Sequence, residues 1–114
     1  MEVLFAGVAT ADFEAAVPWY EALMGRPYDL VAHDTEVMWR ISDGGWLYLV
    51  ADAARAGQAL VAMTVPDLEA ALDEVVARGL ARPDVEIIGA AHKATFHDPE
   101  GNAIAFIEVP TQTG

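Results

Sequence analysis

The sequence contains no cysteine, which excludes disulfide bonds and thiolate chemistry. Basic residues are scarce: 6 lysine and arginine residues face 18 acidic ones, for a formal net charge of −12 at pH 7. Such a field repels phosphate backbones, so we expect no nucleic-acid partner. No apolar run approaches the roughly 20 residues that span a bilayer, and no basic signal-peptide segment follows Met1. We therefore expect a cytoplasmic protein with no membrane partner.

The residues that are present suit one compact domain. Hydrophobic residues make up 54% of the 114, which is typical of a folded core rather than of disorder. The excess of acidic residues has two interpretations. It keeps the protein soluble, or it attracts cationic small molecules by electrostatic steering.

The chain contains an internal repeat. Asp12 to Ala16 (DFEAA) recurs 55 residues later as Asp67 to Ala71 (DLEAA), and a short apolar run precedes each copy. Because this offset is about half of the chain, the sequence predicts two modules of one design inside a single domain, 1–114. The expected divisions are module 1 at about 1–52, a linker at about 53–58, module 2 at about 59–110 and a tail at 111–114.

Both modules are expected to contain the same order of elements. Asp12 and Asp67 are suited to begin helices, because an aspartate side chain accepts hydrogen bonds from free N–H groups there. Gly25 and Gly79 are suited to end them. Strands are expected at 2–9, 28–33, 36–41, 46–51, 59–65, 85–88, 92–97 and 103–109. The prediction is an α+β fold of two tandem βαβββ modules, with the helices outside and the sheets curved into a cup-shaped cleft.

Three motifs give the chain a family resemblance. They are the repeated helix start, the aromatic-Tyr helix end from Trp19 to Gly25 (WYEALMG), and the turn from Phe96 to Asn102 (FHDPEGN) before a last apolar strand. On these motifs the chain resembles the vicinal oxygen chelate superfamily, which includes glyoxalase I, extradiol dioxygenases and bleomycin-resistance proteins. The resemblance implies the fold but leaves the activity open, because one fold hosts unrelated activities.

The metal site that the resemblance implies is missing its ligands. Metal-dependent members place one ligand on the first strand and one on the last strand of each module. The corresponding positions here are Phe5, Tyr48, Leu60 and Ala105. They offer at most one phenol, whereas divalent metals need several N, O or S donors that converge on one point. We therefore expect no metal and no cofactor.

The lining of the expected cup follows from strand alternation. It is apolar and aromatic, which suits a flat hydrophobic ligand. On the strand at 36–41 two registers remain open: either Trp39 and Ile41 or Met38 and Arg40 face inward. The predicted ligand-binding residues are Phe5, Trp39, Trp46, Tyr48, Leu60, Thr64, Phe96 and Ala105.

Three functions fit these observations. The first is a metal-free small-molecule binding protein, similar to bleomycin-resistance proteins, that holds a hydrophobic or aromatic ligand, with cationic antibiotic-like compounds among the candidates. The second is a metal-independent isomerase, cyclase or lyase. It is less favoured, because no nucleophile or acid–base pair is recognisable by spacing and no catalytic residue can be named. The third is a dimerisation module without a ligand. The resemblance also implies a homodimer.

Overall fold

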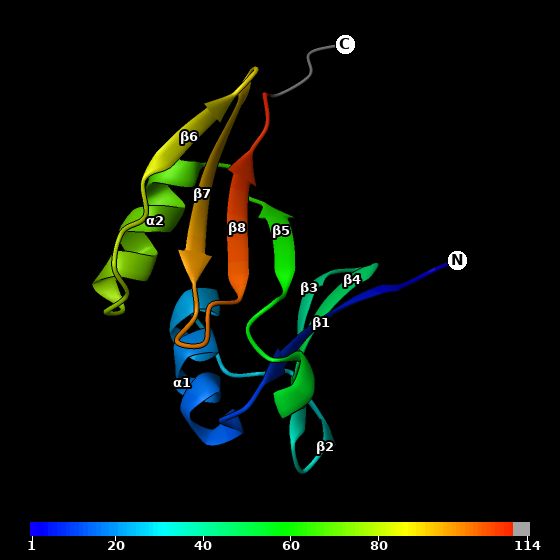
Figure 1. The fold of residues 1–114 in the computed structure, drawn as a ribbon. Coiled ribbons are helices and arrows are strands. Elements are labelled where there is room, and N and C mark those ends of the chain that lie inside the picture. The colour runs from blue at the N-terminus through cyan, green and yellow to red at the C-terminus, as the bar shows by residue number, and fades with distance from the viewer. Residues whose placement is uncertain (111–114) are drawn as a thin grey trace.

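The computed structural model describes residues 1–110, which form two βαβββ modules in tandem (Figure 1). Module 1 contains β1 (Leu4–Thr10), α1 (Phe13–Met24), β2 (Leu30–His33), β3 (Glu36–Ser42) and β4 (Gly45–Ala51). Module 2 contains β5 (Leu60–Thr64), α2 (Leu68–Ala77), β6 (Val85–Ile88), β7 (Ala91–His97) and β8 (Ala103–Glu108). A short 3-10 helix, η1 (Ala53–Arg55), joins them. The predicted α+β fold is confirmed, while the expected tail at 111–114 lies outside the described residues.

Each module forms its own four-stranded sheet, in the order β1-β4-β3-β2 or β5-β8-β7-β6. In both sheets the first and last strands of the module run parallel, and the remaining pairs are antiparallel. Gly7 pairs with Tyr48 in the first sheet, and Ala62 pairs with Ala105 in the second. The two modules therefore repeat in register as well as in sequence.

The helix boundaries follow the predicted capping residues. The Asp12 side chain accepts a hydrogen bond from the Ala15 N–H at 3.2 Å, and the Asp67 side chain accepts one from the Ala70 N–H at 3.1 Å. These bonds satisfy N–H groups that have no partner within a helix. Gly25 ends α1 with φ +78°, a left-handed conformation that favours glycine. No helix in residues 1–110 has the length and apolarity needed to cross a membrane.

One hydrophobic core joins the two modules. It consists of the faces of both sheets that lie against the helices, together with the inner sides of α1 and α2. Its fully buried side chains include Tyr20, Trp39, Leu49, Leu72 and Ile104. The side chains that alternate with these strand residues lie on the opposite face of each sheet, and we call this surface the open face.

A buried polar cluster at the β7–β8 turn ties the modules together. Asp98 is 5% exposed and accepts hydrogen bonds from the Tyr20 hydroxyl at 2.7 Å and from the Asn102 side chain at 2.8 Å. Asn102 in turn donates to the Ala9 carbonyl at 3.0 Å and accepts from the Ala59 N–H at 2.8 Å. Burial, and then the bond to Asp98, raise the pKa of the Tyr20 hydroxyl, which keeps this donor protonated.

Glu100, in the same turn, reaches the start of α1. Its carboxylate accepts hydrogen bonds from the Thr10 hydroxyl, from the Ala11 N–H at 2.7 Å and from the Asp12 N–H at 3.1 Å. The Thr10 bond, followed by the Ala11 bond, lowers the pKa of the Glu100 carboxyl. The turn from Phe96 to Asn102, one of the three motifs that carry the family resemblance, thus holds module 2 against module 1.

Candidate functional site

The register of β3 decides which of its side chains lie on the open face. Met38 pairs with Tyr48, and Arg40 pairs with Trp46. Residues that pair across neighbouring strands share a face, so Met38 and Arg40 lie on the open face together with Tyr48 and Trp46. Of the two registers left open by the sequence, the structure has the one with Met38 and Arg40.

Trp39 was predicted to bind ligand, and its placement in the cup is wrong. It pairs with Leu47, on the face covered by the helices, and is 0% exposed. Its indole N–H donates to the Arg26 carbonyl at 3.0 Å, and its ring lies 6.2 Å from that of Tyr20, between centroids. The reason is strand alternation: a shift of one residue along a strand moves each side chain to the opposite face of the sheet.

Phe96 is also misplaced by the sequence-based prediction. It pairs with Ile104, is 4% exposed and packs edge-on against Phe106 at a centroid distance of 5.2 Å. It therefore belongs to the hydrophobic core. Its neighbours His97 and Thr95 occupy the open face by alternation.

The other predicted residues lie on the open face of one sheet or the other. Phe5 and Trp46 are partners on β1 and β4, and their rings are 6.4 Å apart at an angle of 30°. On the second sheet, Leu60 is 82% exposed and Thr64 is also exposed, whereas Ala105 is 1% exposed. Ala105 therefore offers little surface to a ligand.

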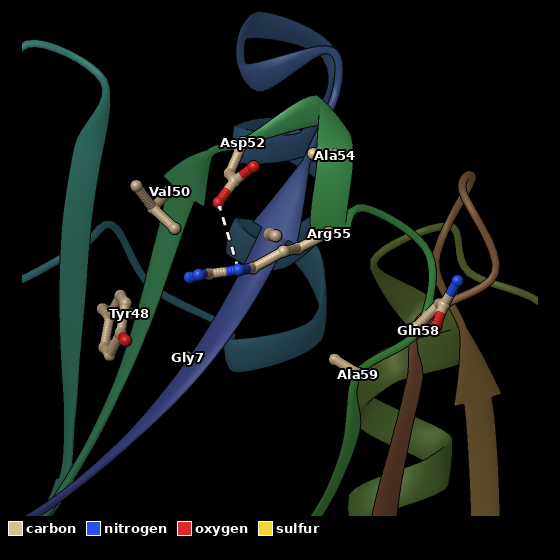
Figure 2. A pocket seen from close by; sticks show the side chains of 9 residues that line it. Gly7, Tyr48, Val50, Asp52, Ala54, Arg55, Gln58 and Ala59 are labelled. Carbon is tan, nitrogen blue, oxygen red and sulfur yellow. Dashed lines mark ion pairs between the residues drawn. The ribbon is translucent and has the colours of Figure 1, made fainter.

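A pocket of about 370 Å³ lies on the open face of the first sheet, beneath η1 (Figure 2). Strands β1 and β4 form its floor, and η1 with the segment after it forms one side. Tyr48 is the one residue of the predicted binding set that lines it. The lining residues are Gly7, Ala9, Tyr48, Val50, Asp52, Ala54, Arg55, Gln58 and Ala59.

The position of the Tyr48 ring depends on the glycine opposite. A Cβ atom placed on Gly7 would lie 2.4 Å from Tyr48 Cζ and 2.5 Å from its hydroxyl oxygen, far inside van der Waals contact. The phenol therefore lies across the Gly7 backbone, a close approach that glycine permits. Gly7 thus sets the position of the aromatic wall of the pocket.

The polar groups of the pocket come from the segment that the sequence predicts to be a linker. Asp52 and Arg55 form an ion pair at 3.7 Å, and the Gln58 side chain lies at the other end of the segment (Figure 2). One signal was available in the sequence, since an acidic residue three positions before a basic one is typical of a helical turn. That signal predicts η1 but does not place it over a sheet.

The four positions that correspond to metal ligands do not form a donor set. Phe5, Leu60 and Ala105 have no donor atom, and Tyr48 contributes one phenol oxygen. Within residues 1–110 no group of three or more His, Cys, Asp or Glu side chains is arranged to hold a metal ion. These residues do not fit the divalent ion of the metal-dependent members.

Comparison with known proteins identifies the family. A family model described as a glyoxalase-like domain matches residues 4–107. The crystal structure of a glyoxalase/bleomycin resistance protein from Catenulispora acidiphila DSM 44928 is 40% identical, with a TM-score of 0.90, over 96% of this chain and 100% of that one. A search of curated protein sequences gives no significant match.

Two further solved structures, less similar in sequence, share the fold. TnmS3, an antibiotic binding protein from Streptomyces sp. CB03234, is 21% identical with a TM-score of 0.75, over 96% of this chain and 97% of that one. A glyoxalase-related enzyme from Clostridium phytofermentans is 16% identical with a TM-score of 0.77, over 96% of each chain. Because the family model spans nearly the whole sequence, this chain belongs to the glyoxalase-like domain family of the vicinal oxygen chelate superfamily.

Proposed function

We propose that the protein binds a hydrophobic or aromatic small molecule reversibly, without a metal ion. The observation that carries this proposal is the pocket beneath η1, where Tyr48, Val50 and Ala9 present an apolar and aromatic floor. Its volume of about 370 Å³ lies within the range of roughly 300–1,000 Å³ that is usual for ligand pockets. TnmS3, an antibiotic binding protein, has the same fold, so the fold is compatible with this class of function.

An enzymatic role has less support from the site. An isomerase or lyase would need an acid–base pair at the reacting atoms. Asp52 is the carboxylate of the pocket lining, and its ion-pair partner is Arg55. Within residues 1–110 no hydrogen bond joins the Tyr48 hydroxyl to another side chain. The pocket therefore supplies binding surface rather than a paired acid and base.

Binding should be independent of metal and sensitive to the position of Tyr48. We expect aromatic compounds of a size that fits this pocket to bind saturably in isothermal titration calorimetry, with the same affinity in EDTA as in zinc. In Gly7→Ala the new methyl group displaces the Tyr48 ring, and we expect affinity to fall by about 3- to 10-fold, as for a lost aromatic contact of about 1 kcal/mol.

The matched control for this experiment is Ala62→Ser. Ala62 occupies the position in module 2 that corresponds to Gly7, lies outside the pocket lining and gains a single heavy atom in the same way. It should bind like the wild type. Binding that disappears in EDTA and returns with zinc would contradict the proposal, as would the absence of binding by every compound.

We also propose that the protein forms a homodimer that covers part of its exposed apolar surface. On the open face Leu60 is 82% exposed and Phe5 is 51% exposed. Large apolar side chains exposed to this degree are typical of association surfaces. A second copy of the chain would bury these side chains and cover part of the open face.

The dimer should be sensitive to charge at Leu60. We expect Leu60→Asp to weaken self-association at least about tenfold, because a carboxylate would have to be buried in an apolar contact. Analytical ultracentrifugation over a range of concentrations measures this effect. Val76→Asp, at an exposed apolar position on α2, is the control and should leave association unchanged. A wild-type protein that sediments as a monomer at all concentrations would refute the dimer.

A further inference from the structure

Most basic residues of this acidic chain have structural contacts. Arg26 forms an ion pair with Asp29, and Arg82 forms ion pairs with Asp73 and Glu69. Arg78 donates hydrogen bonds to the Ala22 and Leu23 carbonyls at the end of α1. Arg40 forms an ion pair with Asp43 at 2.9 Å, and Lys93 lies on the second sheet. These contacts account for the charged groups of the arginines outside the pocket.

Arg55 is different. Its only ion pair in residues 1–110 is with Asp52 at 3.7 Å, which is too long for a hydrogen bond. No described residue accepts a hydrogen bond from its guanidinium, and its side chain is 83% exposed. Figure 2 shows this side chain extending from η1 across the pocket, on the same side as Val50 and Tyr48. The pocket thus contains a cation whose donors are free.

We infer that the ligand of this pocket is an aromatic compound with an anionic oxygen group, a carboxylate or a sulfonate, which is bound by Arg55. This inference rests on the proposed binding function. A planar guanidinium donates two parallel hydrogen bonds to such a group. An aromatic body attached to it would then lie on the floor formed by Tyr48 and Val50. Asp52 forms a loose ion pair with the guanidinium at 3.7 Å and does not occupy its donors.

The net charge of −12 does not oppose this assignment at contact distance. Charges on the surface are screened over a Debye length of about 8 Å at physiological ionic strength. The overall field therefore governs the rate of encounter, which it slows for an anion, rather than the strength of a direct pair. Composition alone favours a cationic ligand, whereas the free donors of Arg55 favour an anionic one.

Two fluorescent probes that share one aromatic skeleton test the inference. 1-Anilinonaphthalene-8-sulfonate has a sulfonate, and N-phenyl-1-naphthylamine lacks it. We expect the wild type to bind both probes and the sulfonate more tightly. Arg55→Gln should weaken binding of the sulfonate about 3- to 5-fold, as for a solvent-exposed ion pair worth up to about 1 kcal/mol, and binding of the neutral probe less than about twofold. Arg40→Gln, on the same face but outside the pocket lining, should change neither.

The outcomes separate this inference from the function on which it rests. Equal losses for both probes in Arg55→Gln, or no loss for either, would overturn the anion site while leaving an aromatic-binding pocket. Stronger binding of the sulfonate in Arg55→Gln would have the same meaning. Failure of the wild type to bind either probe would overturn the proposed function and the inference together. Circular dichroism of the variants establishes that each is folded.

Discussion

Replacement of Asp98 by alanine is expected to lower the free energy of unfolding by about 3–5 kcal/mol, the usual cost of breaking a buried charged network. The Asp98 carboxylate accepts hydrogen bonds from the Tyr20 hydroxyl at 2.7 Å, from the Asn102 side chain and N–H at 2.8 and 2.9 Å, and from the Glu100 N–H at 2.9 Å. Alanine leaves these donors buried without a partner. Urea denaturation at pH 7 and fixed protein concentration measures the loss.

Two further variants show whether the loss comes from this network. Asp84→Ala removes an exposed carboxylate and should change stability by less than about 0.5 kcal/mol. Tyr20→Phe removes one donor and should cost about 1–3 kcal/mol. If Asp98→Ala costs no more than Asp84→Ala, the turn does not tie the modules together as described.

The raised pKa of Tyr20 gives this network a pH dependence with a defined sign. A tyrosine has a pKa of about 10 in an unfolded chain, and the folded value lies above this. The unfolded state therefore loses its proton first as pH rises. The contribution of Tyr20 to stability is complete below about pH 10 and declines above it. Tyr20→Phe should abolish that part of the alkaline decline.

The arrangement of elements could be predicted from the sequence because local signals agree with one another. The Asp12 and Asp67 caps, the glycine at position 25 and the alternation of Leu47 and Leu49 with Tyr48 each have a local physical cause. The same alternation predicted which side chains of β1, β4, β5 and β8 lie on the open face. These features needed no knowledge of which strands pair.

The register of β3 could not be predicted in this way. Val37, Trp39 and Ile41 are apolar, but Met38 on the opposite parity is apolar too, so alternation does not select a face. Pairing with β4 selects it, by placing Trp39 opposite Leu47. Phe96 is misplaced for a similar reason, since its face depends on its pairing with Ile104.

The polar half of the pocket depends on the path of the chain between the modules. Residues 52–58 are small and polar, without helical or strand periodicity, and such composition predicts a linker. They acquire a role because the connection from β4 to β5 forms one side of the pocket on the first sheet (Figure 2). That path is a tertiary property, so the spacing of Asp52 and Arg55 indicates a helical turn but no signal in the sequence places Arg55 and Gln58 at the pocket.

Substitution of the two tryptophans first expected in the cup should lower stability by different amounts. Trp39→Ala should lower the free energy of unfolding by about 3–5 kcal/mol, the usual cost of an aromatic-to-alanine change in a core, since Trp39 is 0% exposed. Trp46, on the open face beside Phe5, should cost less than about 1.5 kcal/mol when it is replaced by alanine.

Urea denaturation of Trp39→Ala and Trp46→Ala, together with titration of N-phenyl-1-naphthylamine, tests this assignment. The folded fraction of Trp39→Ala should bind the probe with wild-type affinity, because Tyr48 and Val50 form the floor of the pocket and Trp39 lies on the other face of the sheet. A Trp39→Ala protein with wild-type stability and impaired binding would reverse the assignment. It would mean that β3 presents Trp39 rather than Met38 to the ligand, and the register on which the whole open face depends would be shifted by one residue.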